Sequence, residues 1–305
     1  AGILLKSPTA LERLAQVDTV VFDKTGTLTE PALALVGNAD PQALRTAATL
    51  AASSRHPLSR ALLAAAGPAA AAEGVREVSG QGLALATAAG EIRLGSARFA
   101  AAAAADDGDS PALWLARPGQ PPVRFAFAEA ARADAAAVLA RLRGLGLDIH
   151  LLSGDRPGPV ARLAETLGIA TWQAGCSPVE KVARIEALRA EGRHVLMVGD
   201  GLNDGPSLAA ALVSMSPSTA ADLSQTVADV VFQGAKLAPV VTALLTARRS
   251  QAAMRQNIAL SLGYNVLMVP LAMAGHVTPW LAAAAMSSSS LLVMLNSLRM
   301  RRAVR

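Results

Sequence analysis

The sequence has few of the residues that mark disulfide-rich domains or nucleic-acid-binding surfaces. Its single cysteine, Cys176, excludes an internal disulfide framework and a cysteine-rich metal site. Aromatic residues make up 3% of the chain and the net charge is +5, so basic residues interleaved with aromatic ones are missing and no nucleic-acid partner is expected. No charged leader precedes an apolar run, so we expect no signal peptide, and the initial Ala1 suggests that the true N-terminus lies upstream.

The segment Asp23-Lys24-Thr25-Gly26-Thr27 follows a short apolar run, residues 17–22, that predicts a buried strand. An Asp at the carboxyl end of a strand lies where open α/β sheets bind ligands. Backbone N–H groups, hydroxyls and the Lys24 ammonium around it can hold a phosphoryl group while Asp23 attacks it. The plain alternative is a strand followed by a polar turn, in which Asp, Thr and Gly are ordinary.

Two further strands are predicted to end in polar residues. Residues 147–152 lead to Ser153-Gly154-Asp155, and residues 195–198 lead to Asp200, Asn203 and Asp204. In a parallel sheet such ends converge at one edge. Asp23 and Asp200 can both stay ionised there if a cation lies between them, and oxygen ligands favour Mg²⁺. Lys181 adds positive charge from a helix that begins at Ser177-Pro178.

The middle of the chain, residues 37–122, has a different sequence pattern, which predicts a small α+β insert. His56-Pro57 marks a helix start there, and Gly80-Gln81-Gly82 is a turn between short strands. Taken singly these signals are weak, because a His before Pro is more often structural than ligand-binding. The α/β pattern resumes with a strand at 123–128 and a helix at 134–145.

Near the end, residues 257–274 and 279–298 carry no charge and are long enough to cross a bilayer. Arginines flank both outer ends, so the positive-inside rule places both ends in the cytoplasm. The alternative is a pair of buried helices in a soluble protein. Tyr264, Asn265, Met286 and Ser289 are polar or thioether residues inside these segments, and a thioether near Asn and Tyr suits Cu(I). The serines fit plain helix packing equally well.

The three motifs together resemble those of P-type ATPases. The resemblance implies an α/β fold: a haloacid-dehalogenase-like, doubly wound parallel sheet, interrupted by a small α+β nucleotide-binding domain and followed by two transmembrane helices. It implies that ATP phosphorylates Asp23. The other residues that it implies for this site are Lys24, Thr25, Ser153, Gly154, Asp155 and Lys181 around the phosphoryl group, Asp200 with Asp23 on Mg²⁺, and Asn203 and Asp204 completing the site.

Ser54-Arg55-His56-Pro57-Leu58 is similar to the His-Pro element of the heavy-metal branch, in which the His positions adenine. That branch also implies nucleotide contacts at Pro57, Gly80 and Gly82, and an acidic-x-x-Arg element here formed by Glu129 and Arg132, with Arg132 assigned to the nucleotide. Tyr264, Asn265, Met286 and Ser289 resemble the metal site of Cu(I) exporters, whereas the Lys and Asp of zinc pumps are missing. The resemblance implies Cu⁺ export from the cytoplasm across a bacterial plasma membrane, with the lipid bilayer and a copper chaperone as partners.

The resemblance implies that the chain corresponds to the C-terminal portion of such a pump, without the actuator domain and the first six membrane helices. Three alternatives remain: a pump for zinc, cadmium or another divalent metal, a membrane-anchored phosphohydrolase of the same fold, and a non-transporting truncated chain. Thr25 argues against the phosphohydrolase, because such enzymes generally use an acid/base Asp there. The expected boundaries are 1–36 for the stalk helix and first part of the phosphorylation domain, 37–122 for the nucleotide-binding domain, 123–235 for the second part of the phosphorylation domain, 236–255 for a stalk, 256–274 and 279–298 for the spans, and 299–305 for a basic cytoplasmic tail.

Overall fold

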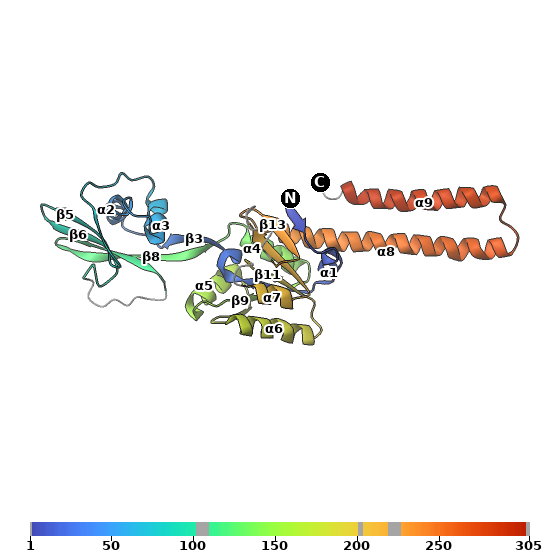
Figure 1. Ribbon diagram of the computed structural model, residues 1–305, viewed down its shortest axis with the longest axis horizontal. Helices are drawn as coiled ribbons and strands as arrows, with labels where there is room; N and C mark the ends of the chain where they lie inside the picture. The colour runs from blue at the N-terminus through green and yellow to red at the C-terminus, as the bar shows by residue number, and fades with distance from the viewer. Residues whose placement is uncertain (1, 102–109, 201–203, 219–226, 303–305) are drawn as a thin grey trace. The chain divides into compact units, whose positions relative to one another are not determined.

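The computed structural model describes residues 2–101, 110–200, 204–218 and 227–302 (Figure 1). Asn203 therefore lies outside the described residues. The chain divides into two compact units, one made of residues 1–21, 137–148 and 182–305 and the other of residues 22–136 and 149–181.

Seven strands form the α/β sheet that the sequence predicts. Hydrogen bonds connect the starts of three of them: the Asp18 N–H donates to the His194 carbonyl, and the Asp148 N–H donates to the Asp18 carbonyl. These strands therefore begin at one edge and run in parallel. In spatial order the sheet contains β1 (Ile3–Leu5), β13 (Val230–Gln233), β12 (Val213–Ser218), β11 (Val195–Val198), β2 (Thr19–Asp23), β9 (Asp148–Leu152) and β10 (Thr171–Gln173).

The helices of this α/β pattern come between strands along the chain, as expected for parallel connections. The stalk helix expected within residues 1–36 is confined to α1 (Ala10–Gln16), and β1, which precedes it, pairs antiparallel with β13. The remaining helices are α4 (Ala135–Gly144), α5 (Pro157–Leu167), α6 (Pro178–Ala190) and α7 (Gly205–Ala210).

The inserted segment forms a separate antiparallel sheet with α2 (Pro41–Ala51) and α3 (Pro57–Ala66) packed on it. The helices bury Leu50 and Leu62 against Leu115, Phe125 and Phe127. The spatial order of the sheet is β3 (Thr29–Val36), β8 (Gln120–Ala131), β7 (Ala112–Arg117), β6 (Gly90–Gly95), β5 (Gly82–Thr87) and β4 (Arg76–Val78).

The strand predicted at residues 123–128 forms, but not in the sheet expected for it. It is part of β8, which pairs with β3 and β7 in the inserted sheet. Phe125 and Phe127 alternate with Arg124 and Ala126 along this strand, and the two Phe side chains complete the apolar core under α2 and α3. This sheet thus extends beyond residues 37–122 on both sides, and the domain boundaries stay a prediction.

Two long helices end the chain. α8 (Ala238–Met273) is continuous through the predicted stalk and first span, and α9 (Pro279–Arg302) follows a short turn and lies beside it (Figure 1). The Asn296 side chain on α9 donates a 2.9 Å hydrogen bond to Asn257 Oδ1 on α8. In the part of the chain that the structure describes, no helix combines the length and apolar character needed to cross a membrane. The spans predicted at 256–274 and 279–298 are therefore helical but unconfirmed as membrane crossings.

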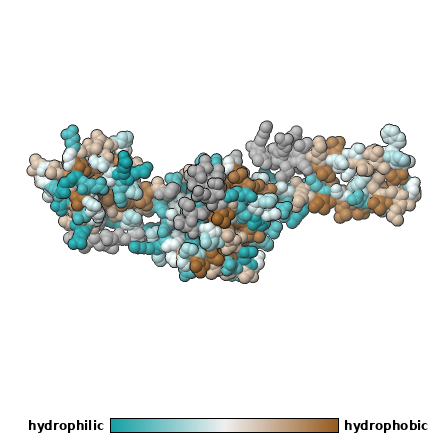
Figure 2. All heavy atoms as spheres, in the orientation of Figure 1, coloured by the Kyte–Doolittle hydropathy of each residue, from teal (hydrophilic) through white to brown (hydrophobic). Residues whose placement is uncertain are grey.

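Hydrophobic side chains gather along these two helices on the face drawn in Figure 2. Ile258 and Val266 on α8 are 60% and 67% exposed, and Met286 on α9 is 64% exposed. Larger exposed apolar patches commonly mark surfaces that another partner covers.

Candidate functional site

Asp23 ends β2, a strand whose five residues are all buried. Its side chain receives a 2.6 Å hydrogen bond from the Lys181 ammonium on α6. Asp23 is 5% exposed and Lys181 is 8% exposed, so the two opposite charges form a buried ion pair. The structure thus brings together two of the residues assigned from the sequence to the phosphoryl group, 158 residues apart in the chain.

The start of α6 fixes where Lys181 lies. Ser177 Oγ accepts a hydrogen bond from the Glu180 N–H, and the Glu180 carboxylate accepts one of 2.8 Å from the Ser177 N–H. This is a capping box, with Pro178 at the first helical position. The backbone hydrogen bond from Ser177 holds the pKa of the Glu180 carboxyl below its ordinary value. The predicted helix start is confirmed.

Lys24 lies between two carboxylates and is 5% exposed. Its ammonium is 2.5 Å from Asp155 Oδ2 and 2.7 Å from Glu129 Oε2. Burial alone lowers the pKa of Lys24, but hydrogen bonds to Asp155 and Glu129 outweigh burial and raise the pKa above its ordinary value. Lys24 is therefore cationic at neutral pH. The sequence assigned Lys24 to the phosphoryl group, and the structure shows that its ammonium pairs with acidic side chains.

The turn after β9 presents Asp155 to Lys24. Ser153 is 2% exposed, and its Oγ accepts a 3.2 Å hydrogen bond from the Asp155 N–H. The Ser153 carbonyl accepts a hydrogen bond from the Cys176 N–H, which ties the turn to the segment before α6. Gly154 is exposed within this turn, and Thr25 is exposed beside Lys24. The 153–155 turn and the Asp23 segment therefore meet through Lys24.

Arg132 contacts the loop that follows Asp23. Its Nε and Nη2 each donate a 2.6 Å hydrogen bond, to the carbonyls of Thr27 and Gly26. The structure thus gives Arg132 contacts to the loop that follows Asp23, and the nucleotide contact assigned to it stays a prediction. Glu129, the acidic partner in the same element, contacts Lys24 directly, and its role had no signal in the sequence beyond its spacing from Arg132.

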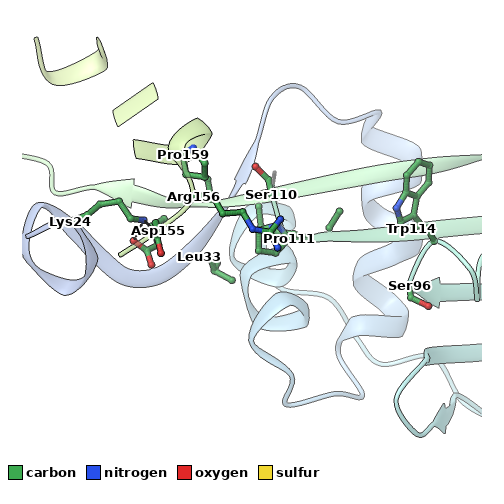
Figure 3. Close-up of a pocket in the computed structure, with 14 residues that line it drawn as sticks. Lys24, Leu33, Ser96, Ser110, Pro111, Trp114, Asp155, Arg156 and Pro159 are labelled. Carbon is green, nitrogen blue, oxygen red and sulfur yellow. Dashed lines mark hydrogen bonds and ion pairs between the residues drawn. The ribbon is translucent and has the colours of Figure 1, made fainter. Parts of the chain in front are cut away.

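A pocket of about 570 Å³ opens beside Lys24, a size typical of small-molecule sites (Figure 3). Lys24, Asp155 and Arg156 lie toward one end, and Ser96 and Trp114 lie toward the other. Charged groups at one end and an aromatic surface at the other suit a ligand with a phosphate and a ring. The sequence analysis did not single out Ser96 or Trp114; in the structure Ser96 directly follows β6 and Trp114 lies in β7.

The predicted nucleotide residues His56, Pro57, Gly80 and Gly82 are not among the described residues that line this pocket. His56 precedes α3, and its Nδ1 accepts a 3.3 Å hydrogen bond from the Leu58 N–H. Pro57 is the first residue of α3, and Gly80 forms a turn with a φ of 69°. The structure gives His56 and Pro57 the capping role that was the alternative, and their nucleotide contact stays a prediction.

Gly82 faces Gly95 across the inserted sheet. A Cβ on Gly82 would overlap the Leu94 carbonyl oxygen, and a Cβ on Gly95 would overlap the Gln81 carbonyl oxygen. Gly82 and Gly95 thus let β5 and β6 approach closely. This structural role is distinct from the nucleotide contact predicted for Gly82.

Gly95→Ala is therefore expected to destabilise the inserted sheet by about 1–3 kcal/mol, because backbone must move to admit the methyl group. Urea unfolding followed by circular dichroism measures this. Gly144→Ala is the matched control, since nothing lies within 4 Å of the added Cβ. Equal unfolding midpoints for wild type and Gly95→Ala would show that the strands are not held this close.

Of the predicted magnesium ligands, Asp23 ends β2 and Asp200 follows β11, and Asp204, which is 2% exposed, precedes α7. Asn203 belongs to the same predicted site but lies outside the described residues. Among the described residues there is no group of three or more His, Cys, Asp or Glu side chains able to hold a metal. Mg²⁺ commonly uses one or two carboxylates and completes its shell with phosphate oxygens and water. The oxygen-only donors Asp23 and Asp200 fit that chemistry.

The residues predicted for a transported metal lie on the two long helices. Asn265 lines a groove of about 750 Å³ along α8. Asn257 and Ser261 of α8 and Val293 of α9 line the same groove. Tyr264, Met286 and Ser289 are described but do not line this groove. The structure therefore does not gather the four residues in one pocket, and a metal site there stays a prediction.

Comparison with known proteins places this geometry in a family. Residues 17–211 match the model of the haloacid dehalogenase-like hydrolases. The match spans more than half of the chain, and the chain belongs to this family. The matched range includes both the strand that ends in Asp23 and the inserted sheet.

Curated relatives indicate which members of this family the chain resembles. The chain is 49% identical over 308 residues to the nitrogen fixation protein FixI of Bradyrhizobium diazoefficiens, covering 99% of this chain and 42% of that protein. It is 34% identical over 324 residues to the probable copper-exporting P-type ATPase V of Mycobacterium tuberculosis, covering 99% of this chain and 42% of the relative. The chain thus spans about two fifths of the length of the curated relatives it matches.

Solved structures of similar fold are also heavy-metal ATPases. The crystal structure of a zinc-transporting PIB-type ATPase superposes with a TM-score of 0.85 at 29% identity, covering 98% of this chain and 52% of that one. The catalytic domain of the CPx-ATPase CopB-B, studied for changes upon nucleotide binding, gives 0.56 at 29% identity, covering 80% of this chain and 94% of that domain. The resemblance to heavy-metal P-type ATPases is confirmed, and so is the α/β fold with an inserted nucleotide-binding-type domain.

Proposed function

We propose that this chain is the ATP-hydrolysing part of a heavy-metal pump and that Asp23 is its phosphorylated residue. The observation that carries the proposal is the buried Asp23 carboxylate at the end of β2, held 2.6 Å from the Lys181 ammonium. A carboxylate fixed by a cation is suited to nucleophilic attack on a phosphoryl group, and the next residue, Lys24, lines the 570 Å³ pocket at its charged end.

The proposed reaction has two steps. An Asp23 carboxylate oxygen forms a bond to the γ-phosphorus of ATP, while the bond from that phosphorus to the β–γ bridging oxygen breaks and ADP leaves. A water oxygen then attacks the same phosphorus, the bond to Asp23 breaks, and inorganic phosphate leaves as the carboxylate is restored. Lys181 offsets negative charge at the reacting oxygens, and Lys24 holds Asp155 at the edge of the pocket.

Asp23 and Asp200 would hold Mg²⁺ in this proposal, with Asn203 and Asp204 completing the site. When bound, Mg²⁺ neutralises phosphate charge. The chain's own contribution is a buried setting in which the Lys181 ammonium contacts Asp23, because Lys181 and Asp23 are both more than nine-tenths buried. Such fixed charges need little reorganisation during the reaction.

Incubation of the 305-residue chain with Mg²⁺ and γ-labelled ATP tests the proposal. We expect acid-stable label on the protein that hydroxylamine removes, because hydroxylamine cleaves acyl phosphates and leaves phosphoserine intact. Chelation of Mg²⁺ before ATP is the control and should prevent labelling. Fast turnover of p-nitrophenyl phosphate without labelling from ATP would instead favour the phosphohydrolase, and ATP binding without either would favour a non-catalytic chain.

For the transported ion we propose Cu(I), moved outward through a membrane portion that includes α8 and α9. The relatives named as copper-exporting ATPases support this, as do the exposed apolar side chains of these helices and the presence of the Met286 thioether on α9. Tyr264, Asn265, Met286 and Ser289 are the proposed ligands. The similarity to a zinc-transporting ATPase makes Zn²⁺ the rival ion.

Metal choice is tested with the full-length gene product in membranes. A Cu(I)-specific chelator should abolish ATP turnover, and a Zn²⁺-selective chelator should leave it unchanged. The opposite pattern would assign the pump to a divalent metal.

A further inference from the structure

The loop Lys24–Leu28, here called the 24–28 loop, turns sharply after Asp23. Thr25 has an extended backbone, with φ −73° and ψ 127°, and Gly26 has a φ of 69°. Such a loop cannot satisfy its carbonyls through a regular helix or strand, so other groups must bind them. Arg132, directly after β8, binds these carbonyls, and Glu129, near the end of β8, binds side chains at the two ends of the loop.

Arg132 binds the middle of the 24–28 loop. Its guanidinium donates to the Gly26 and Thr27 carbonyls at 2.6 Å each, and its backbone N–H donates to the Leu28 carbonyl at 2.9 Å. Arg132 is 8% exposed, and burial lowers the pKa of its guanidinium, although arginine stays charged at neutral pH. The planar fork of the guanidinium thus fixes two successive carbonyls at once.

Glu129 binds both ends of the same loop. Its Oε2 accepts 2.7 Å hydrogen bonds from the Lys24 ammonium and from the Thr29 hydroxyl. Lys24 directly follows Asp23, so this contact fixes the backbone next to the proposed nucleophile. Glu129 and Arg132 together contact the loop from its first residue to the one after its last.

The strand that carries Glu129 and ends just before Arg132 also forms a wall of the pocket. Phe127, Ala128 and Glu129 of β8 line it, whereas Arg132 is not among the described residues that do. The observed contacts therefore argue against Arg132 as a nucleotide ligand. They place the pair between the pocket wall and the loop that follows Asp23.

We propose that Glu129 and Arg132 are positioning residues that hold the 24–28 loop, and with it Asp23, in the geometry needed for phosphoryl transfer. The proposal rests on the proposed function of Asp23. Its distinguishing consequence is that loss of either contact slows phosphoryl transfer from any donor, with or without a nucleotide base. A nucleotide ligand would matter only for donors that carry the base.

Two phosphoryl donors test this: ATP and acetyl phosphate, a small acyl phosphate with no base. Arg132→Ala in the 305-residue chain should lower the rate of Asp23 labelling about 10²-fold with both donors, because displacement of a reacting group by about 1 Å has effects of this size. The KM for ATP should stay at the wild-type value. Arg76→Ala, on the edge strand β4 of the inserted sheet and away from both the loop and the pocket, is the matched control and should label at the wild-type rate with both donors.

A raised KM for ATP with unchanged labelling from acetyl phosphate would overturn the proposal and restore Arg132 as a nucleotide ligand. If Arg132→Ala does not fold, Arg132→Lys replaces it in the test. The single ammonium of Lys cannot bind two carbonyls as the guanidinium does, so this variant should show the same loss of labelling rate with both donors. Glu129→Gln should do likewise, and Glu129→Asp should recover part of the rate. A wild-type chain that labels with neither donor would contradict the proposed function itself, a result separable from failure of the positioning role.

Discussion

Asp23→Asn is expected to abolish labelling from ATP, with a loss of at least about 10³-fold in phosphoprotein formation. The amide lacks the negative charge that makes the carboxylate a nucleophile, and it cannot form an acyl phosphate. The side chain keeps its size at a position that is 5% exposed, so the strand can form as before. Acid-quenched labelling with γ-labelled ATP measures the effect.

Asp18→Asn is the matched control because Asp18 precedes the same strand and bonds His194 at its opposite end. That variant should label at the wild-type level. Hydroxylamine-sensitive label persisting in Asp23→Asn would mean that another carboxylate is the acceptor, and the account of the site would then be wrong.

Lys181→Met is expected to destabilise the protein by about 3–5 kcal/mol, because it leaves the buried Asp23 carboxylate without its cation. Both partners are at least nine-tenths buried, so solvent screens the pair little. Phosphoprotein formation should fall as well, since Lys181 is the described cation in direct contact with Asp23. Urea unfolding monitored by circular dichroism gives the change in stability.

A double-mutant cycle separates the ion pair from the loss of a lysine. Lys181→Met combined with Asp23→Asn removes both charges, so the pair of changes should cost less stability than the sum of the single changes. Lys236→Met, at an exposed lysine, should change stability by no more than about 0.5 kcal/mol. Strict additivity of the two single changes would contradict a buried Asp23–Lys181 interaction.

The parts of the fold that the sequence predicted correctly depend on local signals. The run before Asp23 was predicted as a strand, and Ser177-Pro178 was predicted as the start of α6; the capping-box contacts of Glu180 were found only in the structure. Because parallel strands place their polar ends at one sheet edge, the contact of Lys24 with the 153–155 turn was also expected in outline.

The parts that the sequence could not supply depend on pairing between distant segments. Nothing local shows that β8 joins β3 rather than the parallel sheet, because an alternating strand satisfies either. The contacts of Arg132 with the 24–28 loop and of Glu129 with Lys24 span more than 100 residues of chain, and a charged side chain predicts no particular partner. β1 was missed because three residues carry too little periodicity.

The prediction for the nucleotide site depended on a resemblance and remains open at particular residues. His56 caps α3 and Gly82 opposes Gly95, which are sufficient structural reasons for a His before Pro and for a glycine in a strand. Ser96 and Trp114 instead line the described pocket. A nucleotide bound there would quench the fluorescence of Trp114, the tryptophan among the described residues that line this pocket.

The central claim is that ATP phosphorylates Asp23. Reduction of the labelled chain with tritiated borohydride converts a phosphorylated aspartate to homoserine, and peptide mass spectrometry then locates the modified residue. We predict homoserine at position 23 alone, formed only after incubation with ATP and Mg²⁺. Homoserine at another aspartate, or none despite stoichiometric ATP hydrolysis, would contradict the account.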